Sequence, residues 1–520
     1  MTRTQPQPTL VKRFLTQDLT LPSELAANPR LRARSLQGTV LALMVRRRFE
    51  RLEALSSLDG LENAAPKCCA GRARPARSFG CFEKALAAPG RRFIFEVKTA
   101  SPSEGVMKAD FGPQALEQLV TLYERFTDAV SVLVEPDFFG GSFERLSQVR
   151  ALTGKPILAK DIVVDERRIL AAKAAGADAV LLMLSVLSDE GYAQLAQFAQ
   201  SLGLDVLTEV HDELELAAAA RMGARVIGIN NRNLKTLATD FGSTLRLASL
   251  VPKDRVLVSE SGFMKRDDIL LLESGLSPKH RTPDAYLIGS AVTKAREPSA
   301  VVRELVFGRV KVCGITRPDD AAAAALSGAS AIGLILAKRS KRAVSLDAAP
   351  TLAKAVRARC AALALPVEIV AVLDAEEALD LAFAAALAGN RPDLAAALEA
   401  LIKEGAAESF LLDAASPQSG AAGRTGGTGA AFEHNVLDRL PALERIAVAG
   451  GLAPGNIARL ARRVPAPMEI DVNSGVESSL GIKSRALLEA FFNALRASPG
   501  ASTDAPKEDQ YEHEARHANA

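Results

Sequence analysis

The strongest constraint on the fold is a regular alternation of short apolar runs with segments of helical period. Beginning at Phe93, eight such runs follow one another along the first half of the chain: "FIFEVK", "AVSVLV", "PILAKD", "DAVLLML", "DVLTEV", "RVIGIN", "RVLVSE" and "DAYLIG". Nearly continuous apolar runs separated by helical segments are typical of βα units, whose parallel strands are buried on both faces. Eight such units are enough to close a (β/α)8 barrel.

The same pattern starts again at Arg309 with fewer runs, namely "RVKVCGITRPDDA", "AIGLIL", "VEIVAVL", "FLLD", "RIAVAGGL" and "MEIDVNSGVE". Between the third and fourth lie only 34 residues, 375–408, where a regular barrel needs on the order of 60. This Ala- and Leu-rich segment predicts two helices broken near Pro392 and no strand. We therefore predict an α/β fold of two tandem (β/α)8-type barrels, the second with about six strands. The strands that flank the gap would be exposed, paired with each other or covered by those helices.

The length of 520 residues suits two barrels of roughly 250 residues each. We expect a flexible Pro- and Arg-rich extension over residues 1–38 and a first barrel over residues 39–307. The helix "SAVVRELVFG" then leads almost without a linker into a second barrel over residues 308–496. The polar residues 497–520 are expected to be a disordered tail.

Charge and composition exclude several classes of function. Lys and Arg total 64 against 61 Asp and Glu, a net charge of +3, so no overall field attracts nucleic acid or an anionic membrane. No run approaches about 18 uninterrupted apolar residues, and the first residues lack the apolar core of a secretory signal. The absence of acidic residues before Asp18 also allows a transit peptide. The five scattered cysteines indicate a reducing cytoplasm. We further expect a monomer that acts on small phosphorylated molecules.

One metal-binding pattern occurs in the chain. The stretch "HEARH", from His513 to His517, matches the H-E-x-x-H motif of zinc proteases. It lies in the polar C-terminal tail, no third ligand follows it, and no apolar helix face surrounds it. We therefore expect no metal and no cofactor.

Polar side chains occur where the predicted strands of the first half end. Lys98, Lys160, Glu209, Asn230 and Ser261 all lie at or just beyond a strand end, where (β/α)8 barrels carry their chemistry. The last two runs lead into "SESGF" and "LIGSAV", whose small residues expose backbone N–H groups that can hold a phosphate. The sequence thus predicts a phosphorylated substrate.

Some of these residues also have purely structural explanations. Glu96 and Lys98 could form an ordinary salt bridge at a strand end, and Glu209 could cap the helix that follows it. Gly262 could only turn the chain. Five polar residues on one rim favour a site over these separate explanations.

The motifs in both halves resemble known families. In this order, "FEVKTASPSEGV", "ILAKDIVVD", "LLMLSVL", "LTEVHDE", "GINNRNL", "SESGF" and "LIGSAV" closely resemble indole-3-glycerol-phosphate synthase. The stretches "KVCGITRPDDA", "AKRSKRAVS", "FLLD", "GGTG", "AGGLAPGNI" and "DVNSGVE" followed by "GIK" resemble phosphoribosylanthranilate isomerase. Over roughly residues 36–496, the chain is similar to the bacterial fused synthase–isomerase of tryptophan biosynthesis.

For the first half, the resemblance implies decarboxylating ring closure of 1-(2-carboxyphenylamino)-1-deoxyribulose 5-phosphate to indole-3-glycerol phosphate. Lys160 or Lys98 would protonate the ketone oxygen, Glu209 would work with the lysines as base and acid, and Glu96 would position the cations. We expect the two lysines to lower each other's pKa. The substrate and its phosphate would be bound by Asn230, Arg232, Ser261, Gly262, Gly289 and Ser290, with Ser101 near the mouth.

For the second half, the resemblance implies an Amadori rearrangement of N-(5-phosphoribosyl)anthranilate with Cys313 as base and Asp413 as acid. Arg342 would bind the anthranilate carboxylate and Asp471 would contact the substrate. The phosphate would be held by Gly450, Gly451, Ser474 and Gly475. A buried thiol is more often a small apolar side chain than a catalyst, and Arg342 could belong to a solvated basic loop.

Three hypotheses follow for the whole chain. The first is a bifunctional enzyme, and the second is a synthase whose second half only stabilises or associates. The third is a different phosphosugar isomerase or aldolase on the same barrel, against which the order of the motifs argues. Because strands are missing from the second half, Cys313 and Asp413 could be displaced, and a displacement of about 1 Å can cost roughly 10²-fold in rate. We therefore expect weak or absent isomerase activity.

Overall fold

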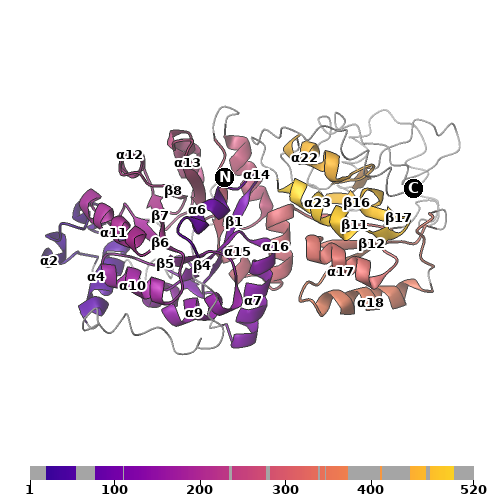
Figure 1. Ribbon diagram of the computed structural model, residues 1–520, viewed down its shortest axis with the longest axis horizontal. Coiled ribbons are helices and arrows are strands. Elements are labelled where there is room, and N and C mark those ends of the chain that lie inside the picture. Colours follow the sequence, from indigo (N-terminus) through magenta and orange to yellow (C-terminus); the bar gives the residue numbers. More distant parts are fainter. Residues whose placement is uncertain are drawn as a thin grey trace.

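The protein consists of two parts with separate sheets, which lie side by side along its longest axis (Figure 1). The computed structural model describes residues 19–53, 77–108, 111–233, 237–276, 281–337, 340–345, 347–372, 410–412, 446–463 and 469–496. Within these residues no helix is both long enough and apolar enough to cross a lipid bilayer.

The first part is a closed barrel of eight parallel strands, which confirms the prediction. The order around the barrel is β1-β10-β9-β8-β7-β6-β5-β4. The strands are β1 (Arg92–Val97), β4 (Ala129–Leu133), β5 (Ile157–Lys160), β6 (Ala179–Met183), β7 (Asp205–Val210), β8 (Val226–Asn230), β9 (Val256–Glu260) and β10 (Ala285–Ile288). Most of them are buried over their whole length, which explains why their sequences are almost continuously apolar.

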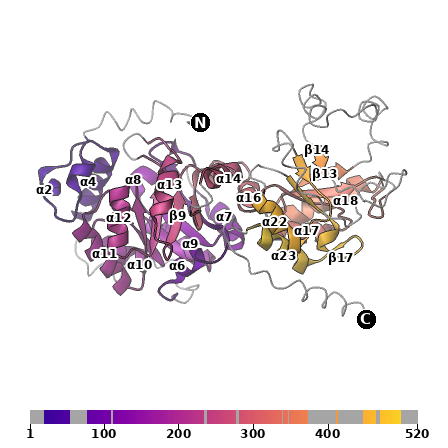
Figure 2. The ribbon, with the colours of Figure 1, turned by 90° about the horizontal axis from the view of Figure 1, so that it is seen from above.

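Helices cover the outside of the barrel (Figure 2). They are α6 (Cys81–Leu86), α7 (Pro113–Phe126), α9 (Phe143–Leu152), α10 (Glu166–Ala174), α11 (Asp189–Ser201), α12 (Glu213–Arg221), α13 (Gly242–Leu247), α14 (Arg266–Gly275) and α16 (Pro298–Phe307). The side chains of Ser142, Asp165, Ser188 and Asp212 accept hydrogen bonds from backbone N–H groups at the starts of α9 to α12. These caps explain where the four helices begin.

Shorter elements lie after three of the strands. A hairpin of β2 (Ala100–Ser101) and β3 (Gly105–Val106) follows β1, α8 (Pro136–Phe139) follows β4, and α15 (Ser290–Thr293) follows β10. All three lie at the carboxyl ends of their strands, so they shape the rim on which a site is expected.

The residues before the barrel pack against it. They form α2 (Ser23–Ala26), α3 (Ala33–Leu36) and α4 (Val40–Glu53). Leu21, Leu31 and Leu36 are buried in the core, although they belong to the segment expected to be a flexible extension. Nη2 of Arg48 on α4 lies 2.6 Å from a carboxylate oxygen of Asp161, just past β5, and both side chains are buried. This ion pair attaches α4 to the rim of the barrel.

In the part of residues 308–496 that the structure describes, six parallel strands follow the order β13-β12-β11-β16-β15-β14, as predicted from the six apolar runs. They are β11 (Val310–Val312), β12 (Ala331–Ile335), β13 (Glu368–Val372), β14 (Phe410–Leu412), β15 (Ile446–Val448) and β16 (Glu469–Val472). Within the described residues β13 and β14 are the edges of an open sheet, and β13 is partly exposed along its length. The two helices predicted between them lie outside the described residues, as does the C-terminal tail.

Among the described residues, the helices that accompany this sheet are α17 (Pro318–Ser327), α18 (Ala349–Ala361), α22 (Pro454–Arg463) and α23 (Arg485–Leu495). A 3-10 turn, η5 (Ser474–Val476), follows β16 and leads into a small hairpin of β17 (Glu477–Ser479) and β18 (Ile482–Lys483). The hairpin and η5 thus lie beyond the carboxyl end of β16.

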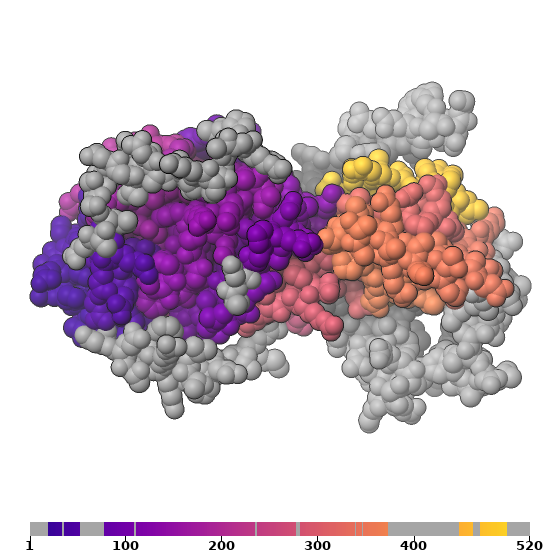
Figure 3. All heavy atoms as spheres, turned by 90° about the horizontal axis from the view of Figure 1, so that it is seen from below, coloured from indigo at the N-terminus to yellow at the C-terminus, as the bar shows by residue number. Residues whose placement is uncertain are grey.

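An aromatic cluster joins the two parts, whose atoms are in contact in Figure 3. The ring of Phe307, at the end of α16, lies edge-on to Phe126 of α7 at 5.9 Å between centroids. It also lies edge-on to Phe492 of α23 at 5.1 Å. The backbone N–H of Arg91 donates to the carbonyl oxygen of Arg496 over 2.8 Å, beyond α23. The last helix of the second part therefore docks on the first barrel.

We expect Phe307→Ala to destabilise the protein by about 3–5 kcal/mol, because it removes a buried ring that packs on both parts. The free energy of unfolding can be measured by urea denaturation. Phe307→Leu, which keeps an apolar side chain, should cost clearly less. Equal and small losses for both variants would contradict a structural role of this contact.

Candidate active sites

Four of the polar residues predicted for the first rim come together at the carboxyl ends of the strands. Nζ of Lys98, just past β1, lies 3.1 Å from Oε1 of Glu96. Nζ of Lys160, the last residue of β5, lies 3.4 Å from Oε2 of Glu209 on β7. All four side chains are at least 85% buried, with exposures of 11%, 6%, 14% and 2%. The rim therefore holds two ammonium groups and two carboxylates in one buried cluster.

A third carboxylate, that of Glu260, belongs to this cluster and was not identified from the sequence. Glu260 is the last residue of β9, is almost fully buried, and contacts Nζ of Lys160 directly. A Cβ atom on Gly228 of β8 would lie 2.0 Å from Oε1 of Glu260, so the carboxylate occupies space that only a glycine leaves open. Its position at a strand end was the available signal, but the neighbouring Ser261 and Gly262 were read instead as a phosphate turn.

The charges in this cluster shift the pKa values of its members in different directions. Burial alone lowers the pKa of Lys160, but the carboxylates of Glu260, Glu209 and Glu96 outweigh burial and raise it. The expectation that two lysines depress each other's pKa is therefore wrong for Lys160, because its nearest charged neighbours are carboxylates.

The carboxylates differ from one another. Burial raises the pKa of Glu209, but Lys160, His211 and Asn230 lower it below its ordinary value. Burial and the carboxylate of Glu209 raise the pKa of Glu260 to about 7, although Lys160 opposes them. One pocket thus contains a proton donor, an ionised base and a carboxyl group that titrates near neutrality, the combination that acid–base chemistry requires.

Arg232 lies over the same cluster and contacts the hairpin after β1. Its Nη1 donates to Oγ of Ser103 over 2.7 Å and to the carbonyl oxygen of Leu237 over 3.0 Å. The hydroxyl of Ser103 lies 3.4 Å from that of Ser101, and both side chains are buried. Burial lowers the pKa of Arg232, since Glu104 and Glu96 compensate only in part. Within the described residues Arg232 forms no ion pair, so its guanidinium suits an anionic group of a substrate.

The two turns predicted to hold a phosphate are placed beside this cluster. Ser261 and Gly262 have left-handed backbone angles, with φ of 69° and 98°, and turn the chain sharply after β9. A Cβ atom on Gly289 would lie 2.5 Å from Oε1 of Glu96 and 3.0 Å from Nζ of Lys98. Ser290 follows at the start of α15. The turn after β10 therefore touches the Glu96–Lys98 pair directly.

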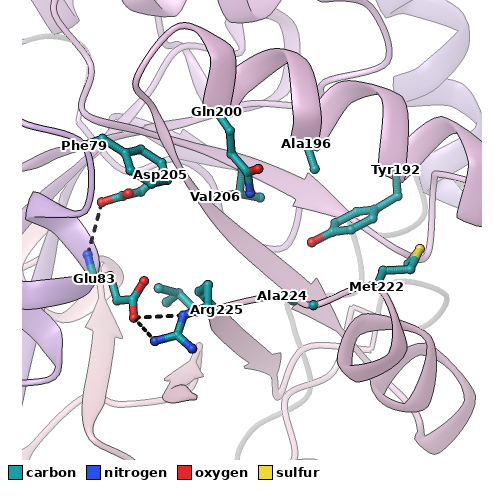
Figure 4. A pocket seen from close by; sticks show the side chains of 12 residues that line it. Phe79, Glu83, Tyr192, Ala196, Gln200, Asp205, Val206, Met222, Ala224 and Arg225 are labelled. Carbon is teal, nitrogen blue, oxygen red and sulfur yellow. Dashed lines mark hydrogen bonds and ion pairs between the residues drawn. The ribbon is translucent and has the colours of Figure 1, made fainter. Parts of the chain in front are cut away.

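A separate pocket lies at the opposite end of the barrel (Figure 4). It is lined by one side of α11, by the starts of β7 and β8 and by Glu83 of α6. The carboxylate of Asp205 accepts hydrogen bonds from the backbone N–H groups of Gly80, Phe82 and Glu83, and Arg225 pairs with Glu83 at 2.6 Å. These contacts close the amino-terminal end of the barrel, the end that in (β/α)8 barrels serves stability rather than catalysis.

In the second part, Cys313 lies just past β11 at the carboxyl end of the sheet. A Cβ atom on Gly314, which has a φ of 69°, would lie 2.8 Å from Cδ of Arg342. Arg342 therefore lies over the turn that follows Cys313. Its Nε donates to both carboxylate oxygens of Glu477, over 2.9 and 3.2 Å, and its Nη2 donates to Oε2 over 2.7 Å. The side chain of Arg342 is only 11% exposed. The alternative of a solvated basic loop is wrong for this residue.

Asp471 lies near these residues and forms an ion pair that joins the neighbouring strands β11 and β16. Nζ of Lys311 on β11 lies 3.0 Å from Oδ2 of Asp471 on β16, and both side chains are buried. Lys311 and Cys313 are two residues apart and so face the same side of the sheet. Burial raises the pKa of Cys313 to about 12, and Asp471 adds to the effect, while Lys311 and Lys483 oppose it. The predicted acid, Asp413, lies outside the described residues.

The two predicted phosphate turns of the second part touch each other. Gly450 and Gly451 follow β15 with φ of 88° and 61°. A Cβ atom on Gly475, next to Ser474 in η5, would lie 2.0 Å from the carbonyl oxygen of Leu452. This close approach of two backbones requires a glycine and brings both turns together.

Comparisons with known proteins agree with these two parts. The family model described as "Indole-3-glycerol phosphate synthase" matches residues 42–305. The model described as "N-(5'phosphoribosyl)anthranilate (PRA) isomerase" matches residues 391–494. A solved phosphoribosyl anthranilate isomerase from Thermus thermophilus is 31% identical and covers 36% of this chain and 98% of its own, with a TM-score of 0.26.

Among curated relatives, the tryptophan biosynthesis protein TrpCF of Vibrio cholerae is 37% identical over 442 residues, covering 81% of this chain and 89% of its own. TrpCF of Yersinia pestis is 37% identical over 428 residues, covering 80% of this chain and 87% of its own. The similarity therefore extends over both parts, which favours the bifunctional hypothesis over a second half without catalysis. The chain belongs to the bifunctional TrpCF family of tryptophan biosynthesis, in which an indole-3-glycerol phosphate synthase domain precedes a phosphoribosylanthranilate isomerase domain.

Proposed function

We propose that residues 39–307 form indole-3-glycerol phosphate from 1-(2-carboxyphenylamino)-1-deoxyribulose 5-phosphate, and that residues 308–496 make this ketose phosphate from N-(5-phosphoribosyl)anthranilate. The observation that carries the proposal is the contact of the Lys160 ammonium with two buried carboxylates at the carboxyl end of a closed barrel. We further propose that the protein works as a monomer in the cytoplasm.

In the first domain, Lys160 is proposed as the acid of ring closure. The aryl carbon that bears the carboxylate bonds to the ketone carbon, and the ketone oxygen takes a proton from Lys160 and becomes a hydroxyl group. Its raised pKa supports this role, because the side chain stays protonated until that oxygen becomes basic. The bond to the carboxylate then breaks and carbon dioxide leaves. Lys98, held by Glu96, would face the departing carboxylate.

Glu209 is proposed as the base of the later dehydration. The hydroxyl group leaves with a proton as water, and Glu209 accepts the proton that the ring must lose to become an indole. Its lowered pKa supports this role because it keeps the carboxylate ionised. Glu260, which contacts Lys160, could return a proton to that lysine after ring closure.

The remaining residues of the first rim are proposed to bind the substrate. Arg232 would hold the anthranilate carboxylate, Asn230 a sugar hydroxyl, and Ser101 would close the mouth. The phosphate would sit on the turns after β9 and β10, formed by Ser261, Gly262, Gly289 and Ser290.

In the second domain, Cys313 is proposed to remove the C2 proton while Asp413 opens the ribose ring as the acid. Arg342 would bind the anthranilate carboxylate through Nη1, since Glu477 already accepts from its Nε and Nη2. Asp471 would act mainly by holding Lys311 beside the thiol. The phosphate would be bound by Gly450, Gly451, Ser474 and Gly475.

The experiment supplies each substrate separately to the full chain and measures indole-3-glycerol phosphate by its absorbance and fluorescence. Both substrates should yield this product, phosphoribosylanthranilate through two successive steps. Product from the ketose phosphate alone would remove the isomerase activity from the proposal, and no product from either would overturn it.

Two independent phosphate sites lead to a further prediction. Gly289→Asp should raise the KM for the ketose phosphate at least about tenfold, because it places a carboxylate against the phosphate and against Glu96. Gly451→Asp should weaken only the use of phosphoribosylanthranilate. Steady-state kinetics of both reactions in both variants test this, and a loss of both activities from either change would contradict separate sites.

A further inference from the structure

His211 lies between two carboxylates directly behind the rim of the first barrel, and the chemistry above gives it no role. It follows β7, two residues after Glu209, and its side chain is 17% exposed. Its Nε2 lies 3.5 Å from Oε1 of Glu209. On the other side of the ring, Nδ1 lies 3.3 Å from Oε2 of Glu215 on α12, which also accepts the backbone N–H of His211 over 2.8 Å.

This arrangement favours the doubly protonated imidazole. A neutral ring carries one N–H, so a ring that donates from Nδ1 to Glu215 would point the lone pair of Nε2 at a carboxylate oxygen of Glu209. Two acceptors would then face each other in a buried site, which is unfavourable. A protonated ring donates to both carboxylates. Within the described residues, Nε2 of His211 and Oε1 of Glu209 are buried atoms without a hydrogen bond, and they lie 3.5 Å apart.

The two oxygens of Glu209 are thus held by two different cations. Lys160 on β5 approaches Oε2 at 3.4 Å, and His211 approaches Oε1. Both distances are long for hydrogen bonds, and such contacts often shorten when a substrate closes the site. A carboxylate fixed at both oxygens cannot rotate, so the direction in which it can accept a proton is set before the substrate binds.

The charged groups that face His211 come from three further elements besides β7. They are the carboxylates of Glu209, Glu215 on α12 and Glu260 on β9, with the ammonium of Lys160 on β5 behind Glu209. Burial lowers the pKa of His211, but Glu215, Glu209 and Glu260 raise it above its ordinary value. The charge balance of the cluster therefore agrees with the hydrogen-bond geometry.

We propose that protonated His211, held by Glu215, is a positioning residue that fixes Oε1 of Glu209 and sets the pH range in which Glu209 acts as a base. The proposal rests on the proposed role of Glu209 in ring formation. Removing a cation beside a carboxylate makes that carboxylate bind its proton more tightly. Without the charge on His211, Glu209 is therefore ionised only at higher pH.

The test is the pH profile of kcat/KM for the ketose phosphate in His211→Gln, which keeps a donor but carries no charge. We expect the acidic limb to move to higher pH by about 1–3 units, the effect of one opposite charge at this distance. The KM at the plateau should stay close to that of the unsubstituted protein, because His211 does not touch the substrate. Glu215→Gln should move the limb in the same direction by less. Glu213→Gln, on the exposed face of α12, is the matched control and should leave the profile unchanged.

Two outcomes separate this proposal from the role of Glu209 itself. If Glu209→Gln loses activity while His211→Gln keeps the unsubstituted acidic limb, the positioning role is wrong and the base is not. If Glu209→Gln stays active, the proposed function of Glu209 fails first. A measurement that does not need a folded His211 variant is NMR titration of the labelled histidines in the full chain. The His211 ring should titrate at a higher pH than in Glu209→Gln, and an unchanged titration would overturn the proposal.

Discussion

Replacing Glu209 by glutamine is expected to reduce the formation of indole-3-glycerol phosphate by about 10²–10⁴-fold, the usual contribution of a general acid or base. The amide has nearly the same shape as the carboxylate and can still contact Lys160 and Asn230, so the pocket should keep its geometry. What it cannot do is accept the proton that the forming indole loses. Single-turnover kinetics with the ketose phosphate measure the loss without interference from product release.

The same experiment on Lys160→Met is expected to show a loss of similar size for a different reason. Methionine removes the proton that the ketone oxygen needs, and it also leaves Glu209 and Glu260 buried without their shared cation. Breaking a buried ion pair in this way typically destabilises a protein by about 3–5 kcal/mol. Thermal unfolding must therefore accompany the kinetics for Lys160→Met, whereas Glu209→Gln should remain close to the original stability.

Glu213→Gln serves as the control for both variants, because this residue is exposed on α12 and pairs only with Arg246 at 3.3 Å. Its activity should equal that of the unsubstituted protein. A residual rate within about tenfold of the original for Glu209→Gln, in a protein that is fully folded, would exclude Glu209 as the base.

Most residues of this candidate site could be predicted from the sequence. Strands and helices alternate regularly in the barrel, so polar residues at the ends of the apolar runs mark its rim. A strand that is buried on both faces is nearly continuously apolar, so charged residues occur mostly near its ends, as Lys98, Lys160 and Glu209 do. A charge inside such a strand needs a buried partner, as Lys311 has in Asp471. Glu260 obeys the same rule and was missed, since it directly precedes a serine and a glycine that suggested a turn. The local sequence cannot show that its carboxylate points into the barrel; the space for it is left by Gly228 on the neighbouring strand.

Other features depend on contacts between distant residues and could not be predicted. The pKa of Lys160 is raised because three carboxylates from three other strands meet it, a fact that depends on the register of the barrel. Leu21 and Leu31 lie in a Pro- and Arg-rich stretch that resembles a flexible extension, yet they are buried. Their burial follows from the apolar surface that the barrel offers beside α4, which local composition does not reveal.

The six strands of the second part were predictable because each is a separate apolar run in the sequence. Cys313 follows β11 and Asp413 follows β14, and the sheet places β16 and β15 between these two strands. Asp413 itself lies outside the described residues. Kinetic evidence on Cys313 is therefore the more direct test.

Replacing Cys313 by serine is expected to reduce isomerase activity by about 10²–10⁴-fold and to leave the synthase reaction unchanged. The hydroxyl of serine is a far weaker acid than a thiol, so almost no anionic base would form at any pH at which the protein is folded. The substitution is nearly isosteric, and the small space between Cys313 and Gly333 should still be filled. Conversion of phosphoribosylanthranilate, coupled to the synthase reaction, measures the loss.

The pH dependence distinguishes a base from a packing residue at this position. Because burial raises the pKa of Cys313 to about 12, only a small fraction of the thiol is ionised near neutrality. As long as the pH is below the pKa, this fraction grows about tenfold for each unit by which the pH rises. The kcat/KM of the isomerase should therefore rise from pH 6 to pH 9 in the original protein and stay nearly flat in Cys313→Ser. Cys360→Ser, which changes another buried thiol away from this rim on α18, should keep the rising profile.

A flat profile in the original protein, or activity of Cys313→Ser within about tenfold of it, would exclude the thiolate as the base. A rate of about 1–10³ s⁻¹ in the original protein would show that the expected weak isomerase activity is wrong, because an incomplete geometry around Cys313 could not sustain a rate typical of enzymes.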